Sequence, residues 1–234
     1  MSTIYKKQIV AFIDLLGFTE VLRDEEKAEK ILDALKKIKS GETKTASSII
    51  ELDGQITNIY MKPTITAFSD NVVISFPENE LKAPASWRHA TIEILNVIQM
   101  IAVFAIQEGF LLRGGMTIGN LHHEDGIVLG NAHIDAYYLE SKVAIYPRIV
   151  ASRELIKCFK ADGSGGTYEC FQQDSSDGMF YLDYLPAIRN NSPRAFEEFS
   201  SVIDKNIFSL SKVDKKIKEL AKWKWFERYY KRVS

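Results

Sequence analysis

Residues 8–19 read QIVAFIDLLGFT, and they define the first element of the fold. The apolar run before Asp14 is typical of a short buried strand. Gly17 breaks this strand, and a charged segment with helical spacing follows from Glu20 to Lys39. Backbone N–H groups at such a turn into a helix can hold phosphate oxygens. The stretch therefore predicts a strand, a phosphate-type turn and a helix, with a carboxylate where the strand ends.

The segments that follow alternate between strand and helix patterns. They are a hairpin turning at Ser69-Asp70, a long helix, a strand, a polar turn and a second helix, over residues 55–76, 84–108, 110–118, 120–126 and 131–144. The order strand, helix, hairpin, helix, strand, helix predicts an α+β protein. It is the order of a ferredoxin-like βαββαβ core, a sheet with helices on one face.

The rest of the chain predicts an exposed loop over 162–178, a late strand over 180–185 and helix from Pro193 to the end. We expect residues 1–190 to form the main domain and residues 191–234 to be a C-terminal helical extension packed on it. The aromatic residues of the extension fall at helical spacing among lysines. This spacing favours core packing or a dimer seam over a stacking platform for nucleic acid; the residues are Trp223, Trp225, Phe226, Tyr229 and Tyr230.

Composition excludes several classes of function. The formal net charge is −1, which gives no field of the kind that a duplex-DNA binder uses. The two cysteines, Cys158 and Cys170, form no CxxC motif and predict neither a disulfide framework nor a structural zinc site. Asp14 interrupts the N-terminal apolar run, so we expect no signal peptide and no membrane anchor. A cytoplasmic protein is the expectation.

Two carboxylates are notable for their positions. Asp14 ends a strand and Asp70 lies at a hairpin tip, and in a ferredoxin-like sheet both can reach one edge. Two carboxylates together with phosphates suit a pair of Mg²⁺ or Mn²⁺ ions. The alternative is that each is an ordinary cap or turn residue.

Three segments resemble motifs of the class III nucleotidyl cyclases, in the same order and at similar spacings. They are the apolar strand with Asp14-Leu15-Leu16-Gly17-Phe18-Thr19, the stretch Ala67-Phe68-Ser69-Asp70-Asn71 with Ser69 in place of the usual glycine, and Arg113-Gly114-Gly115-Met116-Thr117-Ile118-Gly119. The resemblance covers residues 6–152. It implies the class III catalytic-domain fold and two Mn²⁺ or Mg²⁺ ions per active site, held by Asp14, Asp70 and the Leu15 carbonyl. The turn of Leu16, Gly17, Phe18 and Thr19 would then bind substrate phosphates.

A further stretch is similar to the bacterial pyrimidine cyclases of the Pycsar anti-phage systems. It runs Ala136-Tyr137-Tyr138-Leu139-Glu140-Ser141, then Ala144, then Tyr146-Pro147-Arg148-Ile149-Val150. This likeness implies that UTP or CTP is converted to a 3′,5′-cyclic nucleotide and pyrophosphate. The class III resemblance implies a head-to-tail homodimer with active sites at the interface, and the Pycsar likeness implies a separate effector that reads the product.

The sequence departs from the purine cyclases where those enzymes contact substrate. Ile134 and Tyr138 stand where the purine enzymes have an Asn and an Arg that hold the ribose and the charged transition state. Lys142, one helical turn beyond Tyr138, and Arg113 are the candidate replacements for the missing cation. The alternative is a degenerate homologue that binds a nucleotide as a sensor without turnover.

Thr66 stands where purine cyclases have a charged base-reading residue. A short hydroxyl there favours a pyrimidine, although a β-branched residue also suits any strand. Arg113 could recognise a pyrimidine carbonyl, or it could be a structural ion-pair partner. A purine cyclase with unusual contacts therefore stays open. His122 and His123 fall in the predicted polar turn, where we expect them to be solvated.

Overall fold

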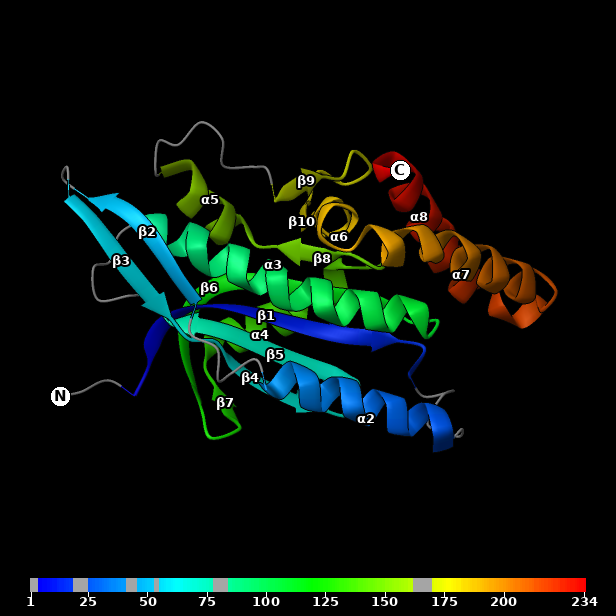
Figure 1. The fold of residues 1–234 in the computed structure, drawn as a ribbon, viewed down its shortest axis with the longest axis horizontal. Helices are drawn as coiled ribbons and strands as arrows, with labels where there is room; N and C mark the ends of the chain where they lie inside the picture. Colours follow the sequence, from blue (N-terminus) through cyan, green and yellow to red (C-terminus); the bar gives the residue numbers. More distant parts are fainter. Residues whose placement is uncertain (1–3, 19–24, 41–45, 53–54, 78–83, 162–169) are drawn as a thin grey trace.

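The computed structural model describes residues 4–18, 25–40, 46–52, 55–77, 84–161 and 170–234. Within these ranges, eight strands form the main sheet, in the order β4-β5-β1-β6-β8-β10-β9 with β7 paired to β6 (Figure 1). Their bounds are β1 Lys6–Leu16, β4 Thr64–Phe68, β5 Asn71–Pro77, β6 Leu111–Glu124, β7 Ile127–Leu129, β8 Ile149–Ala151, β9 Phe171–Gln173 and β10 Phe180–Leu182.

Strand β1 lies at the centre of this sheet. It pairs antiparallel with β5 on one side and with β6 on the other, so the order of the first four strands is β4-β5-β1-β6. That is the strand order of a ferredoxin-like core, and the predicted fold class is confirmed. Strand β8 then adds parallel to β6, and β10 and β9 extend the sheet beyond it.

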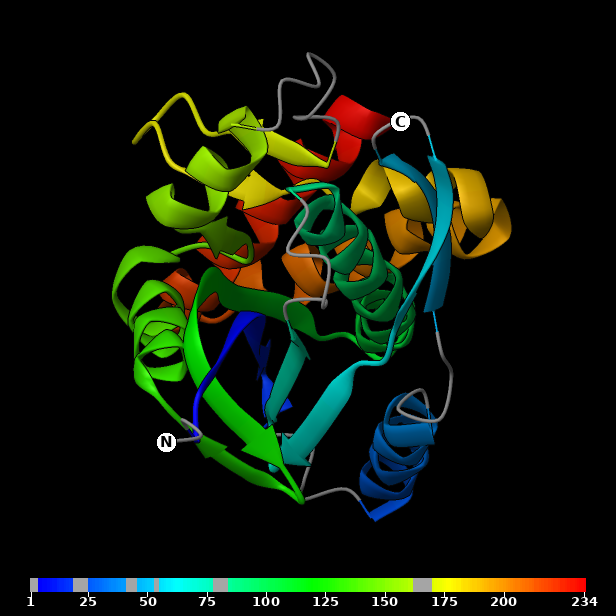
Figure 2. The same cartoon turned by 90° about the vertical axis from the view of Figure 1, so that its left-hand side faces the viewer.

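Helices cover both faces of the sheet (Figure 2). Helix α3 (Pro84–Gln107) packs over the face of β1 that carries Ile9, Ala11 and Ile13, and α2 (Glu25–Ser40) packs against α3 and β4. Helix α4 (Asn131–Tyr138) packs over the other face, against Val10 and Phe12. The expectation of helices on one face is therefore wrong for α4. Successive side chains of β1 point to opposite faces, and both sets are apolar and buried, so each face needs a cover.

Helix α4 approaches β6 closely because Gly115 has no side chain. A Cβ at this position would lie 2.1 Å from the Ala136 carbonyl oxygen. The helix continues from Tyr138 into a π-helical turn, η2 (Leu139–Val143), so the single predicted helix over 131–144 has two parts. This close packing brings Glu140 over the start of β6.

Further predicted elements differ from the structure. The exposed loop predicted over 162–178 contains strand β9, Phe171–Gln173, whose Phe171 side chain is buried. The long first strand of the predicted hairpin, 55–68, is interrupted before Pro63. Its first half is β3 (Gln55–Met61), which pairs with an unpredicted strand β2 (Ala46–Leu52) in a separate two-stranded sheet. Proline has no N–H to continue a ladder. The predicted polar turn at 120–126 is also wrong, because β6 runs to Glu124 and turns only at Asp125-Gly126.

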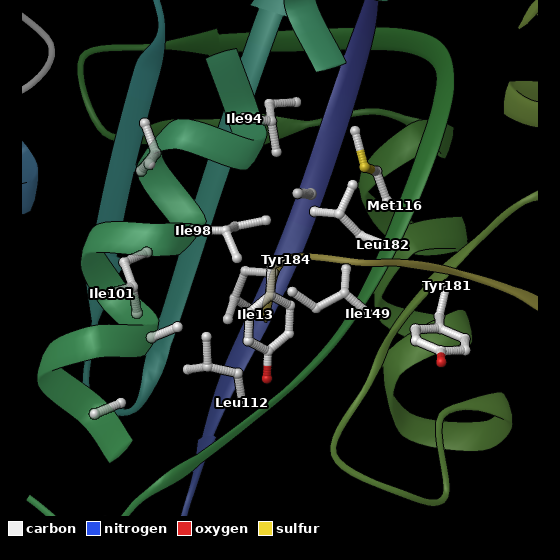
Figure 3. Close-up of a cluster of buried hydrophobic side chains, with 14 of the residues drawn as sticks. Ile13, Ile94, Ile98, Ile101, Leu112, Met116, Ile149, Tyr181, Leu182 and Tyr184 are labelled. Atoms are coloured by element: carbon white, nitrogen blue, oxygen red, sulfur yellow. The ribbon is translucent and has the colours of Figure 1, made fainter. Parts of the chain in front are cut away.

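The C-terminal part is helical, as predicted, and packs on the core. After α5 (Arg153–Ala161) the chain forms α6 (Leu185–Asn191), α7 (Pro193–Ser211), the short η3 (Asp214–Lys216) and α8 (Ile217–Val233). Trp225 of α8 stacks on Tyr146 at 6.0 Å between ring centroids and meets Tyr181 of β10 edge-on. Figure 3 shows Tyr181 and Tyr184 beside the aliphatic core. The prediction of core packing for this aromatic stripe is confirmed, and the division at residue 190 stays a prediction.

In the described residues, one helical stretch, Trp87–Gln107 of α3, is long and apolar enough to cross a membrane by length and composition. Its hydrophobic residues form much of the core against β1, including Ile94, Ile98 and Ile101 (Figure 3). A core helix accounts for this composition.

Candidate active site

Asp14 and Asp70 come together because of strand pairing. Asp14 lies opposite Asn71 in the β1–β5 register, and the Leu15 N–H donates to the Asp70 carbonyl oxygen at 2.9 Å. The Asp70 carboxylate accepts a hydrogen bond from Asn71 Nδ2 at 2.8 Å. Ser69 adopts φ 55°, the left-handed conformation that glycine favours, to make this turn. The two carboxylates chosen from the sequence therefore share one edge of the site.

Arg113 faces Asp14 from the neighbouring strand. The two residues are direct partners in the β1–β6 register, and Arg113 donates from a terminal nitrogen to Asp14 Oδ2 at 3.1 Å. Its Nε donates to Glu140 Oε1 at 2.5 Å, and a terminal nitrogen contacts the same oxygen. Glu140 is buried on η2. Arg113 is thus held between two carboxylates, and the structural ion-pair role left open by the sequence is present in this chain.

The pKa of Asp14 is unusual for a carboxylate at the end of a strand. Burial raises its pKa to about 6; the Arg113 charge opposes this, and the charges of Glu140 and Asp70 add to the rise. One arginine therefore does not balance three carboxylates. An excess of negative charge in a half-buried place favours a bound cation.

The donor set fits a hard divalent cation. Carboxylate and carbonyl oxygens are what Mg²⁺ and Mn²⁺ take, with remaining positions filled by water and substrate phosphates. Within the described ranges, no group of three or more His, Cys, Asp or Glu side chains is placed to hold a metal. A cation here would be coordinated by Asp14, Asp70 and backbone oxygens, and the substrate would complete its coordination. The Leu15 side chain is a hydrocarbon without a donor atom, so only its backbone carbonyl can contribute.

The turn after β1 is only partly as the sequence suggested. Gly17 has φ 99°, a conformation that residues with a Cβ rarely adopt, and Leu16 and Gly17 border a cavity. The Phe18 side chain is buried against Phe110, so any contact it makes with substrate is through its backbone. Thr19 lies outside the described residues.

Thr66 lies on β4, on the same face of the sheet as Asp14 but two strands away. Its hydroxyl is within 2.9 Å of His123 Nε2, and the other ring nitrogen of His123 is 2.8 Å from Ser75 Oγ. The expectation that His123 is solvated is therefore wrong, because the continued strand β6 carries it inward. Burial lowers its pKa to about 4, so the ring is neutral and its single N–H fixes the direction of this network.

The two helix residues predicted as substrate contacts, Tyr138 and Lys142, point outward, as does Ile134. Tyr138 is 58% exposed and Ile134 is 62% exposed on α4, and Lys142 is exposed on η2. None has a hydrogen bond or ion pair to Asp14 or Asp70 among the described contacts. In a single chain these residues do not complete the site.

Sequence reasoning missed three residues that the fold brings to or near the site. Glu140 was part of a motif but had no assigned role, and His123 was taken for a turn residue. Lys222 of α8 lies close enough to Arg113 and Asp14 for their charges to change its pKa. Burial is the main cause of the lowered pKa of Lys222; the charge of Arg113 lowers it further, and the charge of Asp14 raises it. No local pattern marks Lys222, because it is one of several lysines on an amphipathic helix.

Comparison with known proteins gives only distant likenesses. No family model matches the chain, and no curated protein matches it. Among solved structures, a bacterial light-regulated adenylyl cyclase is 14% identical with a TM-score of 0.43, covering 76% of this chain and 90% of that chain. The guanylyl cyclase Cya2 is 13% identical with a TM-score of 0.43, covering 78% and 93%. An adenylate/guanylate cyclase/hydrolase from Silicibacter pomeroyi is 16% identical with a TM-score of 0.39, covering 76% and 95%. Values this low identify no activity, and the assignment below rests on the residues of the site.

Proposed function

We propose that this chain is a metal-dependent nucleotide cyclase that converts a pyrimidine nucleoside triphosphate, UTP ahead of CTP, to its 3′,5′-cyclic monophosphate and pyrophosphate. The observation that carries the proposal is the convergence of Asp14 and Asp70 beside a glycine turn, with a net excess of negative charge. A site of this kind suits cations that carry a polyphosphate. The cyclase motifs of the sequence fall on the same residues.

The residues would divide the work as follows. Asp14, Asp70 and the Leu15 carbonyl would hold two Mn²⁺ or Mg²⁺ ions, which supply Lewis acidity at the ribose hydroxyl and the phosphates. The turn at Leu16-Gly17 orients the phosphate chain through its backbone N–H groups. Arg113 keeps Asp14 ionised and fixed in direction, and Glu140 holds Arg113 in place.

The preference for a pyrimidine rests on Thr66. Its hydroxyl is oriented by His123, and a single oriented hydroxyl can pair with one base carbonyl or amino group. A charged purine-reading side chain is absent at this position. Discrimination of about 10²-fold or more follows when a purine leaves its polar edge unpaired.

The active enzyme is proposed to be a head-to-tail homodimer. Helix α4 and β7 expose a set of large apolar side chains that soluble monomers rarely gather: Ile127, Leu129, Ile134, Tyr137 and Tyr138. Thr66 lies two strands from Asp14 within one chain, so a second copy would bring its base-reading face to the metal site. We further propose a cytoplasmic enzyme of anti-phage defence whose product is read by a separate effector, with no nucleic-acid or membrane partner.

Incubation of the purified protein with each of the four ribonucleoside triphosphates and Mn²⁺ tests the proposal. The expected products are cyclic UMP and, more slowly, cyclic CMP. Faster formation of cyclic AMP or cyclic GMP would overturn the pyrimidine assignment and leave the cyclase. No turnover of any triphosphate, with nucleotide binding retained, would favour an inactive sensor.

A further inference from the structure

A cavity of about 350 Å³ lies where β1 ends, between the catalytic sheet and the C-terminal helices. Leu16 and Gly17 form part of one wall, and residues of α7 and α8 form the opposite wall. Figure 1 shows β1 pointing toward the end of the molecule where α7 and α8 lie side by side. The cavity is therefore continuous with the turn that follows Asp14.

Three lysines line this cavity, Lys205, Lys216 and Lys222, together with the carboxylates Glu108 and Glu219. Lys222 lies close enough to Asp14 and Arg113 for both charges to act on it. It is half-buried on α8. In the part of the chain that the structure describes, its ammonium group makes no hydrogen bond and no ion pair. Its three N–H donors are thus directed to no protein acceptor there.

The other cations near the site are differently placed. The guanidinium of Arg113 is already engaged by Asp14 and Glu140. Lys142, the replacement suggested by helical spacing, is exposed on η2. The ammonium of Lys222 lies near the charges of Glu219 and Asp14 but is hydrogen-bonded to neither in the described residues, so it is a more suitable partner for an anion than the engaged guanidinium of Arg113.

We propose that Lys222 binds the terminal phosphates of the substrate in this cavity, so that the C-terminal helix α8 is part of the active site. The inference rests on the proposed function. In that reaction the ribose 3′-oxygen forms a bond to the α-phosphorus and its proton passes to solvent. The bond from the α-phosphorus to the bridging oxygen breaks, and the electron pair leaves on pyrophosphate. Lys222 stabilises the charge that develops on this leaving group.

Lys222→Met tests the inference, since it removes the charge and keeps the alkyl chain. The matched control is Lys218→Met, one turn earlier on α8, exposed and outside the cavity lining. The affinity for inorganic tripolyphosphate with Mn²⁺ is measured by calorimetry on the full chain. We expect a 10- to 100-fold higher Kd for Lys222→Met, an unchanged Kd for Lys218→Met, and recovery to within a few-fold in Lys222→Arg.

The inference would be overturned if Lys222→Met bound tripolyphosphate as tightly as the native chain. It would also be overturned if Lys218→Met lost as much affinity as Lys222→Met, because that would indicate a general effect of positive charge on α8. Turnover separates the two proposals. If no triphosphate is cyclised by the native chain, the proposed function fails, and the tripolyphosphate comparison still decides the role of Lys222. If cyclisation occurs and Lys222→Met changes neither KM nor the tripolyphosphate Kd, only the inference about Lys222 fails.

Discussion

Two arginines of this protein, Arg113 and Arg148, each contact two carboxylates, and the carboxylates respond in opposite ways. Beside Arg113, burial raises the pKa of Asp14 to about 6, and the nearby Glu140 adds to the rise. Arg148 is 1% exposed and pairs with two carboxylates of the segment between β9 and β10. There, the hydrogen bond from Arg148 lowers the pKa of Asp177.

The difference lies in the balance of charge and in exposure. The Arg148 cluster joins β8 to the β9–β10 segment and holds two carboxylates to one arginine, of which Asp177 is exposed and Asp174 half-buried. At Arg113 a third carboxylate, Asp70, adds to the negative charge, and burial penalises it. The Arg113 cluster, with three carboxylates to one arginine, is the one that we propose takes up a further cation. For this reason we assign a binding role to the Arg113 cluster and a structural role to the Arg148 cluster.

Replacing Asp14 or Asp70 should give the largest effect. Asp14→Ala and Asp70→Ala are each expected to lower kcat/KM roughly 10³-fold, the loss of several kcal/mol of charge stabilisation. The free energy of unfolding at pH 7.5 should not fall for Asp14→Ala, because burial disfavours the ionised carboxylate. Cyclisation assays and denaturant unfolding measure the two quantities. Full activity in either variant would overturn the metal assignment.

Replacing Arg148 should have the converse effect. Arg148→Met leaves Asp174 and Asp177 without their cation and is expected to lower the free energy of unfolding by about 3–5 kcal/mol. Turnover below the melting temperature should persist. The exposed Arg153 gives the control variant Arg153→Met, which should be neutral. Loss of turnover with unchanged stability would place Arg148 in the site instead.

The third prediction concerns pH and the buried His123. Its folded pKa is about 4, against 6.5 for the ordinary side chain, because burial disfavours the charged ring. The unfolded chain therefore takes up a proton at a pH where the folded protein does not. The free energy of unfolding should be full above pH 6.5 and fall by about 3 kcal/mol between pH 6.5 and 4. His123→Gln should flatten this dependence; an equally steep fall in that variant would contradict the assignment.

The smallest effect is expected at Glu140. Glu140→Gln removes a negative charge that raises the pKa of Asp14, so that pKa should fall below its native value of about 6. A carbon-13 NMR titration of the Asp14 carboxyl measures it, with the exposed Glu154→Gln as control. A pKa of Asp14 that stays the same or rises would mean that Glu140 acts only by positioning Arg113.

Much of the fold was predictable because its signals are local. The apolar run before Asp14, the turn at Ser69-Asp70 and the long apolar helix each follow from periodicity or turn chemistry. Strand β2 was missed and β3 was joined to β4, because a separate two-stranded sheet has the same local pattern as a long hairpin arm. Residues 120–124 are mostly polar and therefore predicted a turn, although they form a strand of which only one face is covered.

The sequence by itself determined the βαββαβ order and the pairing of Asp14 with Asp70, since strand ends and a hairpin tip place both at one sheet edge. Only the tertiary structure decided which charges meet. Arg113 reaches Glu140 because Gly115 lets α4 lie close to β6, and Lys222 comes from a helix about 200 residues away from Asp14. Long-range packing sets these contacts, and no periodicity along the chain encodes them.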